Sequence, residues 1–282
     1  MHFTKKISII NLPFILALTI IILISPGLVQ AQFPEKENEE TYEKEWAFGV
    51  LMNSYGGLLG GVSVRHARKY LSNKSFSVPV GGSSSKIRKT KVKQALLKNP
   101  NHYHSFSLDV VNIKHPKEQS YQSSYSGNSF VPQKRNYLVS VRPQYGREII
   151  LFRKAREQGV QVTWITNAGP ALGLKIPYLI RFREDTRVKV EQYDKEKHGQ
   201  NFDQIEGTGS FFEALGQTKF TVGLALKTSL AFEFGVSKHN ISGVEAGLMS
   251  DLFIQEVEIM QGAQNRAFYP SLYLNFFFGT RK

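Results

Sequence analysis

Hydrophobic and polar residues alternate along several stretches of the chain, and an alternation with a period of two predicts β-strands with one apolar face. The pattern is clearest over 220–235, where large apolar side chains hold one face and small or polar side chains hold the other. The stretch 267–282 repeats the pattern with many aromatic residues and ends the chain. All such stretches together predict eight strands. They are 45–55, 58–67, 105–114, 136–146, 160–174, 220–235, 241–251 and 267–282.

Other signals interrupt or join these strands. Pro143 lies inside the fourth strand, where it removes a ladder hydrogen bond and predicts a bulge or an early strand end. Residues 147–159, which stop at Gly159, are typical of a short turn helix. Residues 252–266 are expected to form a loop.

An even number of antiparallel strands can close into a barrel that leaves no open edge. Most of the strands approach the ~9–11 residues that a tilted strand needs to cross a bilayer. The sequence therefore predicts an all-β fold, an antiparallel transmembrane β-barrel of about eight strands with a short turn helix and long loops. Residues 187–193 are expected to extend a hairpin beyond the membrane. A soluble lipocalin-like barrel is the alternative, because it has the same alternation with its apolar face inside.

The polar face favours the membrane barrel because its charges balance. Unpaired charges inside a barrel would be costly, and this face carries three basic and three acidic residues. We expect an interior charge network in which Asp109 and Arg142, on neighbouring strands, pair directly. The network consists of Arg65, Asp109, Arg142, Lys227, Glu233 and Glu245. Aromatic residues near strand ends predict interfacial girdles, and they are Trp46, Tyr137, Tyr145, Phe268 and Phe278.

The first 31 residues are typical of a signal peptide. Lys5 and Lys6 precede an apolar run over 14–24, and a small-residue cleavage site follows near Ala31. An uncleaved anchor helix is the alternative interpretation. Residues 32–44 then predict a charged, flexible N-terminal tail, and the barrel domain is expected over 45–282.

Composition limits the partners of the chain. It has no cysteine, and its formal net charge is +13. Much of that excess lies in 68–104, which is basic and lacks acidic residues. No base-reading geometry is evident, so we expect no nucleic-acid partner. Outer-membrane lipid and lipopolysaccharide are the expected partners of a basic barrel, and a solvated loop or a lipid head-group contact is expected for this segment. Mean hydropathy is −0.26, which excludes a helical membrane bundle.

Candidate chemistry is weak. His102 and His104 have a spacing that could bind metal, but no carboxylate lies near them in the sequence. His66 with Asp109 and a serine would make a catalytic triad only if the fold brought them together. There is no phosphate-binding loop. We therefore expect no catalytic residues, no cofactor and no metal.

The chain resembles the small outer-membrane β-barrel proteins of Bacteroidota. The resemblance covers roughly 45–282, and its motifs are structural. It implies the same fold and an outer-membrane location, and it implies that the last strand is read by the barrel-assembly machinery through Leu272, Leu274, Phe276 and Phe278. The motifs are NIKHPKE (112–118), YGREIILFRKAREQGVQV (145–162), GPALGL (169–174), YDKEKH (193–198), IEGTGSFFEALG (205–216) and SLYLNFFFGTRK (271–282).

The expected function is that of a non-enzymatic integral outer-membrane barrel with a side-chain-filled interior. Its role would be structural, or it would bind partners at the cell surface through the long loops 115–135 and 175–221. One alternative is a porin-like small-solute channel with ten or more strands, formed with part of 68–104. Another is a membrane-embedded barrel enzyme acting on lipid or peptide. The oligomeric state is left open.

Overall fold

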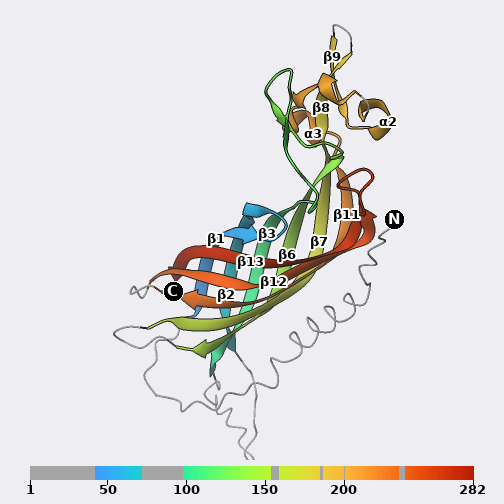
Figure 1. The fold of residues 1–282 in the computed structure, drawn as a ribbon. Helices are drawn as coiled ribbons and strands as arrows, with labels where there is room; N and C mark the ends of the chain where they lie inside the picture. The colour runs from blue at the N-terminus through green and yellow to red at the C-terminus, as the bar shows by residue number, and fades with distance from the viewer. Residues whose placement is uncertain (1–41, 72–97, 154–158, 185–186, 200, 235–238) are drawn as a thin grey trace, which may run out of the picture.

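The computed structural model describes residues 42–71, 98–153, 159–184, 187–199, 201–234 and 239–282. Eight antiparallel strands form a closed barrel in the order β1-β13-β12-β11-β7-β6-β3-β2 (Figure 1). The predicted fold, an antiparallel barrel of eight strands, is confirmed. The strands are β1 (Lys44–Asn53), β2 (Gly57–Leu71), β3 (Lys98–Ile113), β6 (Asn136–Phe152), β7 (Gln161–Pro177), β11 (Lys219–Glu233), β12 (Asn240–Val257) and β13 (Arg266–Arg281).

The strand count excludes a larger barrel. β2 and β3 are hydrogen-bonded neighbours, with Val64 opposite Leu108, so no further strand lies between them. The alternative with ten or more strands is therefore wrong for the described part of the chain. Residues 72–97, the centre of the basic segment, lie outside the described residues.

The predicted turn helix at 147–159 is wrong. β6 continues to Phe152, and its residues 147–150 pair with β7 in a regular ladder. Glu148 and Ile150 point into the barrel and are buried, whereas Arg147 is exposed. This is the period of two of a strand, and it prevails over the helical propensity of the segment. Residues 154–158 lie outside the described residues.

The predicted bulge at Pro143 is also wrong. The β6–β7 ladder keeps the same register on both sides of this residue. In that register Pro143 lies opposite Pro170 of β7, and both are exposed on the outside of the barrel. Neither proline has a backbone N–H, so the facing pair leaves no donor without a partner.

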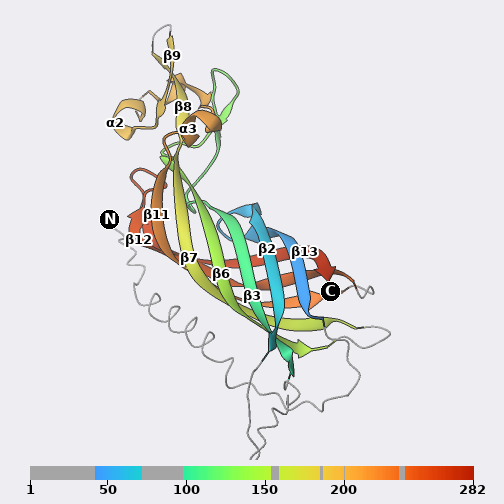
Figure 2. The same ribbon diagram turned by 180° about the vertical axis from the view of Figure 1, so that it is seen from behind.

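A lobe stands at one end of the barrel, above β6, β7 and β11 (Figures 1 and 2). The predicted hairpin at 187–193 is present, as β9 pairs with β8, although β8 itself was not predicted. The lobe sheet has the order β10-β8-β9, and a second sheet pairs β4 with β5. The lobe elements are β4 (Tyr121–Gln122), β5 (Ser129–Phe130), β8 (Leu179–Glu184), β9 (Arg187–Gln192), α2 (Lys195–His198), η2 (Phe202–Gln204), β10 (Ile205–Thr208) and α3 (Phe211–Leu215).

The two ends of the barrel differ. At the terminal end, β1 begins and β13 ends, and the Glu43 N–H donates to the Lys282 carbonyl over 2.8 Å. At the lobe end lie the short turn after β1, the connection 114–135, the lobe and the connection after β12. That last connection is shorter than predicted, because residues 252–257 continue β12. The leader 1–31 and most of the tail 32–44 lie outside the described residues.

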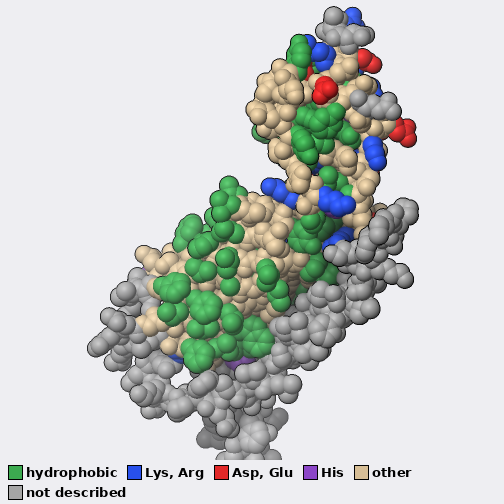
Figure 3. Space-filling model, in the orientation of Figure 1, with side chains coloured by type: hydrophobic (Ala, Val, Ile, Leu, Met, Phe, Trp, Pro, Cys, Tyr) green, Lys and Arg blue, Asp and Glu red, His purple; other side chains and the backbone are tan. Residues whose placement is uncertain are grey.

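The outside of the barrel wall is apolar. Figure 3 shows hydrophobic side chains gathered over the wall, and basic side chains where the lobe joins it. On the barrel strands, the side chains of Phe220 and Leu272 are each 66% exposed. Every strand of the barrel contributes at least one exposed large hydrophobic side chain, while buried charged residues lie inside. No helix in the described part of the chain is long and apolar enough to cross a membrane.

Candidate functional site

All six residues of the expected charge network are buried in the structure. Their side chains come from five different strands and point into the barrel lumen, where further charged residues join them. Among those further residues are Glu45, Glu148, Asp251 and Arg281. Asp251 could have been found from the sequence, because it shares the inward face of β12 with Glu245. Glu148 was missed because the segment around it was assigned to a helix.

Arg65 is the centre of the network at the terminal end. Its guanidinium nitrogens lie 3.3 Å from Glu45, 3.4 Å from Glu148 and 3.5 Å from Glu245. The Ser105 hydroxyl also donates to Glu148 over 2.7 Å. One arginine thus joins β2 to β1, β6 and β12 across the lumen.

Lys227 links Glu245 to Asp109. Its ammonium lies 3.3 Å from the Glu245 carboxylate and 3.2 Å from the Asp109 carboxylate. Glu245 also accepts hydrogen bonds from Ser229 at 2.7 Å and from the hydroxyl of Tyr273. A carboxylate with this many donors and two cations satisfies the requirement for a buried charge.

Arg142 does not pair with Asp109 as expected. The two residues are opposite each other on β3 and β6, but the Arg142 guanidinium forms its ion pair with Asp251. Ser140 supports the same carboxylate with a hydrogen bond of 3.1 Å. Asp109 and Arg142 thus each pair with a residue of a more distant strand. In a barrel with tilted strands, side chains that point into the lumen can contact distant strands as well as neighbouring ones.

A smaller group closes the terminal end of the lumen. Arg281 contacts Glu45 at 2.8 Å and Glu233 at 2.5 Å. Its guanidinium lies 4.0 Å from the centre of the Tyr42 ring, which stacks on Tyr103 at 4.4 Å. Tyr42 is buried, so the end of the predicted flexible tail packs against the barrel.

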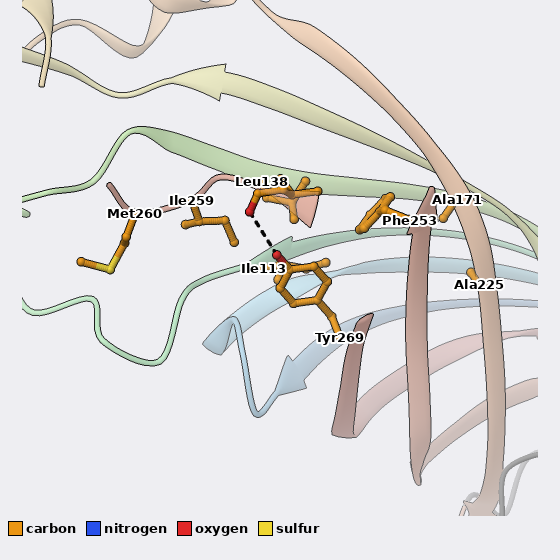
Figure 4. Packing of buried hydrophobic residues seen from close by; sticks show 9 residues of the cluster. Ile113, Leu138, Ala171, Ala225, Phe253, Ile259, Met260 and Tyr269 are labelled. Atoms are coloured by element: carbon orange, nitrogen blue, oxygen red, sulfur yellow. Dashed lines mark hydrogen bonds between the residues drawn. The ribbon is translucent and has the colours of Figure 1, made fainter. Parts of the chain in front are cut away.

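The lobe end of the lumen is filled by hydrophobic side chains, which we call the apolar plug (Figure 4). The Tyr269 hydroxyl donates to the Val257 carbonyl over 3.4 Å and is the polar contact within this group. A gap beside the plug, lined by Arg142, Met249 and Asp251 among others, has no room for a water molecule. The apolar plug consists of Ile113, Leu138, Ala171, Ala225, Phe253, Val257, Ile259, Met260 and Tyr269.

The histidines in the described part of the chain do not assemble the triad or the metal site considered from the sequence. His66 lies on the outside of the barrel, stacked on Trp46 at 4.4 Å, whereas Asp109 points into the lumen. The triad alternative is therefore wrong, since its members lie on opposite faces of the sheet. His104 Nδ1 lies 2.7 Å from the Tyr145 hydroxyl. The described residues include no group of three or more His, Asp or Glu that could hold a metal ion.

An ion pair joins the connection 114–135 at the base of the lobe. The Lys134 ammonium lies 2.5 Å from Glu118 and is almost fully buried. It also lies 4.3 Å from the ring centre of Tyr137 and 5.6 Å from that of Tyr178. Burial lowers the pKa of Lys134, and the Glu118 carboxylate offsets part of that effect.

A second cluster holds α2 against the lobe sheet. Glu191 of β9 accepts hydrogen bonds from Lys197 at 2.7 Å and lies 2.9 Å from His198 Nε2. Partial burial would raise the pKa of Glu191, but the hydrogen bonds from these two side chains outweigh it and lower the pKa overall. The buried His198 ring also packs edge-on against Phe182 at 4.7 Å. These contacts make the lobe a packed unit and not a set of loose loops.

The four residues expected to be read by the assembly machinery lie on the outside of β13. Phe278 is 62% exposed, and Phe276, Leu274 and Leu272 follow on the same face. β13 pairs with β12 and β1, so it joins the end of the chain to its first strand.

Comparisons with known proteins give no family. No protein-family model and no curated protein matches the chain. A crystal structure of Ail, the attachment invasion locus protein of Yersinia pestis, in complex with the heparin analogue sucrose octasulfate covers 86% of this chain and 100% of its own, at 8% identity and a TM-score of 0.39. A structure of Neisserial surface protein A covers 87% of this chain and 100% of its own, at 9% identity and a TM-score of 0.33. Both TM-scores are low, so the assignment of the barrel fold depends on the strand pairing within this chain.

Proposed function

We propose that the chain is an integral outer-membrane barrel with a filled interior, which carries a folded lobe at the cell surface. The observation that carries this proposal is the sense of the alternation. Large hydrophobic side chains cover the outside, such as Phe278 at 62% exposed, whereas Glu245 and Asp109 are fully buried. A soluble barrel has the opposite sense.

The extent of the apolar surface supports a lipid environment. Between Phe220 and Phe232 of β11, the outward side chains include no charged residue. The same holds for β13 between Phe268 and Phe278. Monomeric soluble proteins rarely expose contiguous apolar patches larger than a few hundred Å². A surface that continues around all strands of a barrel matches the hydrocarbon layer of a membrane.

The ends of the barrel suggest its orientation. In outer-membrane barrels the termini lie in the periplasm and the longer loops lie outside the cell. The terminal end would therefore face the periplasm, and Trp46 and Phe278, which are exposed near it, would lie at the inner interface. The lobe would then lie outside the cell, where it is available to bind a partner. The described ends of the basic segment, 68–71 and 98–104, would lie on the periplasmic side.

Other parts of the proposal follow from the sequence. Residues 1–31 would direct export and be removed near Ala31, and the outward face of β13 would be recognised by the barrel-assembly machinery. Outer-membrane lipid and lipopolysaccharide would contact the apolar wall and the basic residues at its edge. The resemblance to Bacteroidota barrels is consistent with this location and names no ligand.

The proposal is tested by membrane fractionation with a gel assay of heat modifiability. We expect the protein in the outer-membrane fraction, with faster migration before boiling than after, because a closed barrel resists the detergent. A protein found only in the soluble fraction, with no shift on boiling, would contradict the proposal. In planar bilayers, steady large openings would contradict the filled interior.

A further inference from the structure

The short helix α3 lies on the outer surface of the barrel wall at the base of the lobe. Its Ala214 is buried against Ile176 of β7 and Leu179 of β8. Its Phe211 meets the ring of Tyr137 of β6 edge-on, with 5.6 Å between the ring centres. These contacts fix α3 beside the last outward residues of two barrel strands.

The opposite side of α3 is apolar and open. Phe212 is 81% exposed, and Phe211 and Leu215 are each 43% exposed. At 100° per residue, these three side chains fall within one arc of the helix, and Glu213 falls on the far side. The helix is thus amphipathic. Tyr137 covers part of Phe211, whereas Phe212 and Leu215 are exposed in the described part of the chain.

This open surface continues the apolar wall of the barrel. Ile176, against which α3 packs, is followed down the outside of β7 by Leu174 and Leu172, and Leu174 lies opposite the exposed Phe220 of β11. Phe212 and Leu215 belong to a helix that packs directly on the upper end of this wall. Lys219, which is exposed, marks a basic position at the same level.

We propose that α3 is an interfacial anchor that lies in the outer leaflet, with Phe212 and Leu215 inserted among the lipids and Glu213 toward water. Amphipathic helices with aromatic residues on the apolar side lie in the interface plane in this way. The anchor holds the base of the lobe against the membrane surface and thereby fixes the direction in which the lobe is presented. The proposal rests on the proposed function, since it needs the wall below α3 to be in lipid.

Because the chain contains no cysteine, a single introduced cysteine can be labelled specifically. A single cysteine replaces Phe212 (F212C) and carries an environment-sensitive fluorophore in folded protein, reconstituted in phosphatidylcholine vesicles. Some vesicles contain lipid with a nitroxide quencher near the head group, and others contain lipid with the quencher deep in the acyl chain. We expect a roughly twofold loss of fluorescence with the shallow quencher and a smaller loss with the deep one.

Two matched variants separate this inference from the proposed function. Phe220→Cys reports on the barrel wall and should be quenched by lipid. Val188 is an apolar residue of β9 in the lobe and is 45% exposed. A fluorophore at Val188→Cys should not be quenched by either lipid. Heat modifiability of each variant verifies that its barrel is folded.

Each outcome decides between the claims. If the probe at 220 is quenched and the probe at 212 is not, α3 is not in the leaflet, and the membrane barrel stands. If neither is quenched in folded protein, the proposed function fails as well. In a parallel sample of unlabelled F212C in vesicles, disulfide-linked dimers would show that a second copy, and not lipid, covers α3, which would also overturn the inference.

Discussion

The two ends of the lumen are filled by different chemistry. At the terminal end, Arg65 and its three carboxylate partners join four strands by charge. At the lobe end, the apolar plug joins β3, β6, β7, β11, β12 and β13 mainly by packing of hydrophobic side chains. Both arrangements fill the lumen, and they respond differently to substitution. A charge network fails when one partner is lost, whereas an apolar cluster loses stability in proportion to the volume removed.

The largest effect is expected for Glu245→Ala. This change removes the carboxylate shared by Arg65 and Lys227 and leaves two buried cations without it. We expect a loss of about 3–5 kcal/mol in the free energy of unfolding, because an uncompensated buried charge is strongly destabilising. Urea unfolding in vesicles, followed by tryptophan fluorescence, measures it.

Ser229→Ala is the matched control for this variant, since it removes one hydrogen bond to Glu245 and no charge. Its expected cost is about 1 kcal/mol. Equal losses in the free energy of unfolding for Glu245→Ala and Ser229→Ala would contradict the claim that ion pairs stabilise the terminal end.

The next effect is expected for Phe253→Ala in the apolar plug. Phe253 is buried among Tyr269, Ala171 and Ala225, and its loss leaves a cavity without any change of charge. We expect a loss of about 3 kcal/mol, and a smaller loss for Phe253→Leu, which keeps more of the volume. The same unfolding assay checks both. A larger loss for leucine than for alanine would show that shape, and not volume, governs this end.

Replacing a pair of charges sharpens the contrast between the ends. Asp109 and Lys227 contact each other at 3.2 Å inside the lumen. Lys227→Met alone leaves Asp109 and Glu245 without their shared cation, so it should cost about 3 kcal/mol. Adding Asp109→Leu should recover about 1–2 kcal/mol, because one of the unpaired charges is then removed. A double-mutant cycle measures the recovery, and strictly additive losses would contradict it.

The smallest effect is expected at the rim. Arg281→Gln removes the contacts to Glu45 and Glu233 where the side chain is 14% exposed, so water can compensate in part. We expect a loss of about 1 kcal/mol, well below that of Glu245→Ala. A loss as large as that of Glu245→Ala would show that Arg281 contributes to stability as much as the fully buried charges do.

The alternation of β11 and β13 was enough to predict strands, their outward faces and the inward charges. It could not give the partners of those charges. Asp109 and Arg142 are opposite each other, yet each is paired across the lumen, because the pairing depends on strand tilt and side-chain length. The helical propensity of the segment around Glu148 predicted a helix, whereas pairing with β7 places this residue in a strand.

The lobe was less predictable than the barrel. Its short strands lie in a polar region, and β10 pairs with β8 although β9 and α2 lie between them in the sequence. The α3 segment has no long periodic pattern, so its position on the barrel wall depends on tertiary contacts with Ile176 and Leu179. A helix of this length carries too few residues for its period to be read from the sequence.

The most direct test of the membrane barrel is a nitroxide scan along β11 in lipid vesicles. Single cysteines at Phe220, Val222 and Leu224 would carry spin labels on the outward face, and labels at Thr221 and Ala225 would lie on the inward face. The proposal predicts that oxygen, which concentrates in lipid, reaches the outward labels far more than a water-soluble nickel complex does, and that neither reagent reaches the inward ones. Free access of the nickel complex to the outward labels would contradict it.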